Sequence, residues 1–96
     1  MIRVLLVDDQ PIIRTGFKTI LETEPGIEVV GEASDGTRGV ELALELRPDV
    51  VCMDVQMPRM NGIEATRELT SRGCGSAVLI LTTFDRDDFL FETLQA

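Results

Sequence analysis

Four side chains that could do chemistry follow apolar runs in this 96-residue sequence. They are Asp8 and Asp9 after Ile2–Val7, Asp54 after Val50–Met53, and Thr82 after Val78–Leu81. Each run is typical of a short buried strand, and in an open parallel α/β sheet ligands bind beyond the C-terminal ends of the strands. Three carboxylates and a hydroxyl that converge there predict a site for a hard cation and a phosphoryl group.

The three carboxylates need a counter-charge if the first and third strands are neighbours. At ~5 Å and an effective dielectric constant near 20, each pair of carboxylates repels by about 3 kcal/mol. Either one carboxyl group takes up a proton, or a divalent cation neutralises the group. Mg²⁺ suits the second case, because it prefers oxygen ligands and is commonly held by one or two carboxylates together with phosphate oxygens.

Asp54 is the candidate nucleophile, since it stands alone at its strand end and a carboxylate can form an aspartyl phosphate. The Thr82 hydroxyl and the backbone N–H groups of Val55 and Thr83 are predicted to bind phosphoryl oxygens. A purely structural interpretation stands beside this one. An Asp after a strand often caps a helix or forms a turn, and Asp9 is a candidate for such a cap.

The elements that position these residues alternate between strands and helices along the whole chain. The predicted strands are Ile2–Val7, Ile27–Ala33, Val50–Met53 and Ala77–Leu81. The predicted helices begin at Pro11, at Ser34–Gly36, at a capping box of Asn61 and Glu64, and near Asp85, and the first three end before Pro25-Gly26, Pro48 and Gly73–Gly75. This alternation implies one α/β domain, residues 1–96, with a parallel sheet and right-handed crossovers.

Composition excludes several classes of function. The formal net charge of −8 argues against direct nucleic-acid binding by this chain. No apolar run is long enough to cross a membrane and the N-terminus does not resemble a signal peptide, so we expect a cytoplasmic location. Two cysteines and no histidine predict neither a disulfide framework nor a zinc site, and Cys52 is expected in the core.

Three segments together resemble the receiver domain of bacterial response regulators: Val7–Gln10, Met53–Gly62 and Leu81–Asp85. The resemblance runs from Met1 to Ala96 without a gap. Ile27–Ala33 and Thr82–Asp85 further resemble the NarL/FixJ subgroup, whose receivers precede a LuxR-type DNA-binding domain. The resemblance implies a flavodoxin-like (CheY-like) sheet in which the strands present here have the order 2-1-3-4.

The same resemblance implies roles for the site residues. Asp54 would accept a phosphoryl group from the phosphohistidine of a sensor histidine kinase. Asp9, Asp54 and the backbone carbonyl of Gln56 would ligate Mg²⁺, Asp8 would act mainly through a bound water, and Thr82 would be the switch hydroxyl. Such a domain is a signalling module and not an enzyme, although it promotes its own phosphorylation and dephosphorylation.

Receivers of this family continue through a fifth strand, which carries a lysine that pairs with the phosphoryl group, and a fifth helix. This sequence ends at Ala96, before them, and a natural, engineered or proteolytic truncation would each explain it. We expect the Mg²⁺ site to survive and phosphorylation to be slow or poorly sustained. We also expect self-association through the exposed edge of the fourth strand and fourth helix.

Two other functions remain open from the sequence. A Mg²⁺-dependent phosphohydrolase with an aspartate nucleophile would want a second acid where Gln56 stands, and would turn over p-nitrophenyl phosphate repeatedly. A protein-interaction module with vestigial acids would show no Mg²⁺ affinity.

Overall fold

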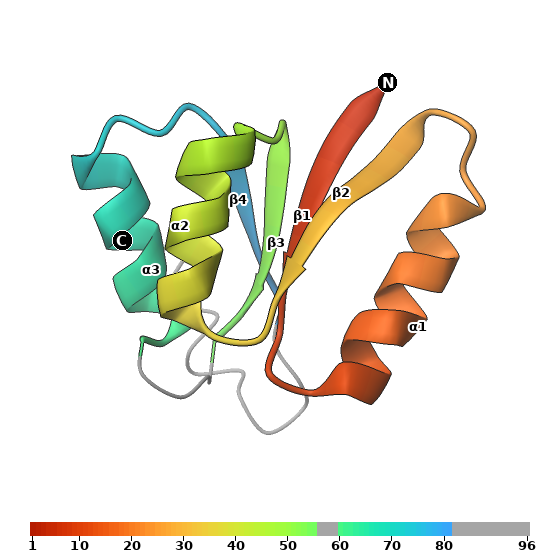
Figure 1. The fold of residues 1–96 in the computed structure, drawn as a ribbon, viewed down its shortest axis with the longest axis horizontal. Coiled ribbons are helices and arrows are strands. Elements are labelled where there is room, and N and C mark those ends of the chain that lie inside the picture. The colour runs from red at the N-terminus through yellow and green to blue at the C-terminus, as the bar shows by residue number, and fades with distance from the viewer. Residues whose placement is uncertain (56–59, 82–96) are drawn as a thin grey trace.

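The computed structural model describes residues 1–55 and 60–81 of the chain. In these residues strands and helices alternate: β1 (Ile2–Val7), α1 (Pro11–Glu22), β2 (Ile27–Ala33), α2 (Gly36–Leu46), β3 (Val50–Asp54), α3 (Gly62–Ser71) and β4 (Ala77–Leu81). The strands form one parallel sheet in the order β2-β1-β3-β4, which confirms the predicted flavodoxin-like order (Figure 1). The helix predicted from Asp85 lies outside the described residues.

The two faces of the sheet carry separate apolar clusters, because successive residues of a strand point to opposite sides. One cluster joins the sheet to α2 and α3 and includes Leu5, Val7, Val51, Met53, Val40, Ala43, Ala65 and Leu69. The other joins Val4, Leu6 and Cys52 to Phe17 and Leu21 of α1. Figure 1 shows α1 on one side of the sheet and α2 with α3 on the other. The prediction that Cys52 is a core residue is confirmed, and burial raises the pKa of its thiol.

Caps confirm the predicted starts of α2 and α3. The Asp35 side chain accepts the Arg38 N–H at 2.8 Å at the start of α2. Asn61 and Glu64 form the predicted capping box of α3, with bonds of 2.9 and 3.2 Å. The first three helices end before the predicted breakers, at Glu22, Leu46 and Ser71. The helix α2 ends at Leu46 because Arg47 adopts a left-handed backbone conformation with φ 50°.

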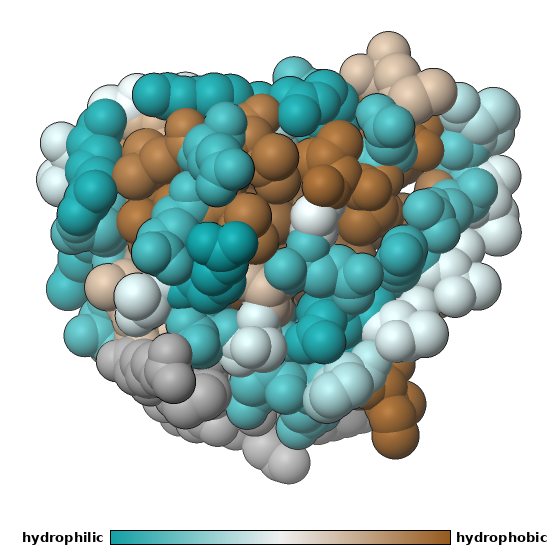
Figure 2. Space-filling model, viewed as in Figure 1, coloured by the Kyte–Doolittle hydropathy of each residue, from teal (hydrophilic) through white to brown (hydrophobic). Residues whose placement is uncertain are grey.

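The strand β4 is the edge of the described sheet beside β3. On it, the Leu79 side chain is 53% exposed. The other large exposed apolar residues lie at the N-terminus and on α1: Met1, Ile2, Ile12, Ile13 and Ile20. Figure 2 shows apolar side chains on the surface at the lower right, where α1 begins, and over the upper half of this face. Leu79 pairs with Cys52, which faces α1, so this side of the described sheet is covered less completely near β4.

Within residues 1–55 and 60–81, we find no helix with the length and apolar character that a membrane crossing requires.

Candidate functional site

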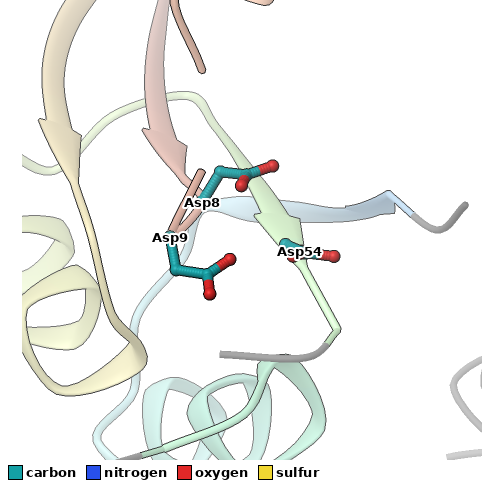
Figure 3. A group of neighbouring side chains, drawn as sticks. All are labelled: Asp8, Asp9 and Asp54. Carbon is teal, nitrogen blue, oxygen red and sulfur yellow. The ribbon is translucent and has the colours of Figure 1, made fainter. Parts of the chain in front are cut away.

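Asp8, Asp9 and Asp54 lie together at one end of the sheet. The strands β1 and β3 are paired in parallel with Val7 beside Met53, so the residues that follow these two positions are neighbours. One carboxylate oxygen from each acid lies within 4.8 Å of those from the other two. Figure 3 shows the three carboxyl groups pointing to the same side. The three acids do come together, as the strand order predicts.

A turn directly after β1 allows adjacent residues to share this pocket. In a continuing strand Asp8 and Asp9 would point to opposite faces of the sheet. Instead, the Asp8 N–H donates to the carbonyl of Ala33 in β2 at 3.0 Å, and the Gln10 N–H donates to Asp8 Oδ1 at 2.8 Å. The Asp8 carboxylate therefore closes the turn that brings Asp9 beside it.

The interpretation of Asp9 as a helix cap is wrong. The N-cap of α1 is Gln10, which makes no side-chain cap bond, and the only cap-like carboxylate contact described at this turn comes from Asp8. Asp9 Oδ1 is buried and has no hydrogen-bond partner among the described residues. A buried carboxylate oxygen without a partner is costly unless a cation or a ligand satisfies it.

Asp54 is the last residue of β3 and is buried, with Oδ1 accepting the Val55 N–H at 2.8 Å. The start of α3 packs directly against this strand end. The Gly62 N–H donates to the Val55 carbonyl at 2.8 Å, and a Cβ at Gly62 would collide with the carbonyl oxygen of Asp54. The sequence analysis missed Gly62 as part of the site. A glycine directly after a helix N-cap was the available signal.

The electrostatics of the cluster act most clearly on Asp8. Burial is the largest cause that raises the pKa of the Asp8 carboxyl group above its usual value, and the charges of Asp54 and Asp9 raise this pKa further. The Gln10 N–H and the Arg14 guanidinium oppose the rise. The pocket thus favours a proton or a cation over three bare carboxylates.

The residues present fit Mg²⁺. All three side chains offer hard oxygen ligands, and Asp9 Oδ1 lacks another partner among the described residues. One oxygen from each of the three carboxylates lies within 4.8 Å of the other two, so these acids could hold one small hard cation, directly or through a bound water.

Arg14 is a second residue that the sequence analysis missed. Its guanidinium lies against the backbone of Asp8, with Nη1 donating to the Asp8 carbonyl at 2.6 Å. The signal in the sequence was a basic residue six positions after Asp8 on a predicted helix. The predicted site residues Gln56, Thr82 and Thr83 lie outside the described residues.

The sequence matches the family model described as "Response regulator receiver domain" over residues 4–96. The transcriptional regulatory protein LiaR of Bacillus subtilis is 48% identical over 96 residues, which are 100% of this chain and 46% of LiaR. The chain therefore spans about half the length of this curated relative.

Solved structures with the same fold include two of particular interest. The signal receiver domain of the putative response regulator NarL from Mycobacterium tuberculosis has a TM-score of 0.91 and 33% identity, and the match covers 98% of this chain and 76% of that one. RcsB from Salmonella enterica serovar Typhimurium, solved bound to the promoter rprA in the presence of the phosphomimetic BeF₃⁻, has a TM-score of 0.87 and 26% identity. That match covers 99% of this chain and 80% of the solved chain.

Proposed function

This chain belongs to the family of response regulator receiver domains, and from this premise we propose that it is a phosphoacceptor switch in two-component signalling. Asp54 accepts a phosphoryl group from the phosphohistidine of a sensor histidine kinase. The proposal rests mainly on one observation: Asp8, Asp9 and Asp54 cluster within 4.8 Å, with a buried Asp9 oxygen that has no hydrogen-bond partner among the described residues. RcsB, solved with a phosphomimetic group, supports the choice of phosphoryl chemistry.

The transfer is an in-line displacement at phosphorus. A carboxylate oxygen of Asp54 forms the new P–O bond, the P–N bond to the kinase histidine breaks, and the leaving imidazole nitrogen takes up a proton. Val55 orients the nucleophile, since its N–H holds Asp54 Oδ1 at 2.8 Å. The Val55 and Thr83 N–H groups and the Thr82 hydroxyl then bind phosphoryl oxygens.

Mg²⁺, when bound, neutralises charge that develops on the phosphoryl oxygens. We propose that Asp9, Asp54 and the backbone carbonyl of Gln56 hold it directly. By the resemblance to receiver domains, Asp8 would contribute mainly through a bound water, while its Oδ1 accepts the Gln10 N–H.

The phosphorylated receiver is proposed to control a DNA-binding output domain outside this chain, as the name of LiaR, a transcriptional regulatory protein, suggests. The partner is then a histidine kinase that phosphorylates the receiver in the cytosol. In this role the domain is a switch and not an enzyme with a separate substrate.

A second copy of the chain is a further proposed partner. The β4 edge exposes Leu79 and leaves unpaired strand groups in the described sheet, and such edges favour association. The predicted contribution of a fourth helix concerns residues outside those that the structure describes.

The test is the mass of the purified chain after incubation with acetyl phosphate and Mg²⁺. We expect an addition of about 80 Da, the mass of one phosphoryl group, on the parent chain. The Asp54→Asn variant, which keeps the shape but lacks the nucleophile, should show no addition, and EDTA should prevent the reaction. Unlabelled parent with Mg²⁺ bound would contradict the phosphoacceptor proposal, and repeated turnover of p-nitrophenyl phosphate would favour a phosphohydrolase.

A further inference from the structure

We propose that Arg14 is a positioning residue for the acid cluster. By holding the backbone carbonyl of Asp8, it fixes the turn that brings the Asp8 and Asp9 side chains to the same side and thereby sets Mg²⁺ affinity. This inference rests on the proposed function, because it concerns the same metal site.

Although Arg14 is a cation close to three acids, it binds a backbone carbonyl. Its Nη1 donates to the carbonyl oxygen of Asp8 at 2.6 Å and not to a carboxylate oxygen of the cluster. That carbonyl belongs to the peptide group that joins Asp8 to Asp9. A short bond from a charged donor restrains this peptide group strongly, and its orientation decides where Asp9 lies.

An ion pair with Glu32 anchors the guanidinium: Arg14 Nε lies 3.1 Å from Glu32 Oε1. Lys18 Nζ lies 3.5 Å from Glu32 Oε2. The Arg14 side chain is only 19% exposed, so its pair with Glu32 is shielded from water better than an ordinary surface pair. The planar fork of Arg can hold Glu32 and the Asp8 carbonyl at once, which the single ammonium group of Lys does less well.

The contacts form a closed path around Asp8. Glu32 directly precedes Ala33 in β2, and the Ala33 carbonyl accepts the Asp8 N–H at 3.0 Å. The N–H side of Asp8 is thus bound to β2 directly, and its C=O side is bound to β2 through Arg14 and Glu32. Both ends of the residue that starts the turn are held by the same strand.

Two effects of Arg14 on a bound cation oppose each other. Its positive charge repels Mg²⁺ and weakens binding, whereas the fixed turn places the ligands in advance and strengthens it. The charge is paired with Glu32, which reduces the repulsion. Outer residues that orient metal ligands commonly change affinity by about 10- to 100-fold, so we expect the positioning effect to exceed the repulsion.

The experiment measures the dissociation constant of Mg²⁺ alone by isothermal titration calorimetry on the whole 96-residue chain. Arg14→Met is expected to weaken binding about tenfold, and Arg14→Lys to restore part of the loss. Lys18→Met is the matched control, because it removes the same charge from the same network without touching Asp8. We expect this control to stay within about twofold of the parent.

A merely structural role would give a different result. In that case thermal unfolding in EDTA would show that Arg14→Met is less stable than the parent, but the Mg²⁺ dissociation constants of Arg14→Met and Lys18→Met would be equal. Equal dissociation constants overturn the inference. If Arg14→Met does not fold, Arg14→Lys tests the positioning role, because it keeps the positive charge and loses the planar fork: affinity about threefold weaker than that of the parent supports the role, and unchanged affinity overturns it. Absence of Mg²⁺ binding by the parent overturns both proposals, whereas binding that Arg14→Met retains overturns only the role of Arg14.

Discussion

Individual residues at the candidate site place like charges close together and leave one buried oxygen without a described partner. Asp8, Asp9 and Asp54 lie within 4.8 Å of one another, and the pKa of Asp8 is raised mainly by burial. The N–H of Gln10 and the guanidinium of Arg14 partly offset the free-energy cost of a charged Asp8 carboxylate. In the absence of metal the site is therefore a source of instability, which single substitutions can relieve.

Asp8→Asn is expected to stabilise the metal-free protein at pH 7 by an amount on the order of 1 kcal/mol, because it removes like-charge repulsion and keeps an oxygen for the Gln10 N–H. Burial raises the pKa of Asp8 in the folded state above its ordinary value of 3.8, so the folded state binds more protons than the unfolded state between these two pKa values. The protonated Asp8 therefore contributes its whole stabilising effect at a pH below the unfolded-state pKa. This contribution is lost as the pH rises through the folded-state pKa.

The advantage of Asp8→Asn over the parent should therefore grow as the pH rises through that window and disappear near pH 3.8. Urea unfolding in EDTA at several pH values from 4 to 7 measures it. Equal stability of the two proteins across this range would contradict the argument.

Mg²⁺ should stabilise the parent, because it binds the folded carboxylate cluster and not the unfolded chain. At a concentration ten times the dissociation constant, the gain is about 1.4 kcal/mol. Asp54→Asn should gain much less from Mg²⁺ while folding normally in EDTA. Thermal unfolding with Mg²⁺ and with a matched amount of NaCl measures the difference, and an equal gain for both proteins would place the cation elsewhere.

At the scale of elements, the site depends on how closely α3 approaches the end of β3. The capping box of Asn61 and Glu64 fixes where α3 begins, and Gly62 lets this first turn touch the backbone of Asp54. Gly36, at the start of α2, lies equally close to the backbone of Met60, just before α3, where a Cβ would collide with the carbonyl of Met60. Both close approaches need glycine for space and not for a positive φ.

Gly62→Ala is expected to lower the free energy of unfolding by about 2 kcal/mol, because its Cβ would force α3 away from Asp54. The same displacement should weaken Mg²⁺ binding. Gly16→Ala is the matched control: it lies in α1 with no atom near the new Cβ, and alanine there should stabilise by about 0.5–1 kcal/mol. Chemical denaturation of both variants tests the pair, and a neutral Gly62→Ala would contradict the packing argument.

At the scale of the whole molecule, the two faces of the sheet are covered unequally. The face toward α2 and α3 buries a large cluster, whereas α1 covers the opposite face mainly near β1 and β2, and Leu79 of β4 remains 53% exposed. The formal charge of −8 opposes contact between copies, and salt screens that repulsion. Association should therefore depend on both the apolar edge and the ionic strength.

We expect sedimentation equilibrium to detect self-association at high concentration, increasing from 50 to 500 mM NaCl. Leu79→Lys should reduce it by placing a charge on the edge strand. Ile12→Lys is the matched control, because the Ile12 side chain lies on α1 and is 86% exposed. This variant should leave association through β4 unchanged. A parent that stays monomeric at high concentration and high salt would remove the proposal of a second copy as partner.

The sequence by itself determined the strands, their order by resemblance, the helix caps at Asp35 and Asn61, and the cluster of acids at the strand ends. These follow from local patterns, since the apolar period, capping residues and strand-end acids act over a few positions. Only the tertiary structure decided that Asp8, and not Asp9, closes the first turn, and that Arg14 and Gly62 belong to the site. The reason is physical: the Asp8 N–H bonds to Ala33 of β2, Arg14 of α1 reaches the Asp8 carbonyl, and Gly62 of α3 passes against Asp54 of β3. These contacts join different elements, so the local pattern around each residue does not specify them.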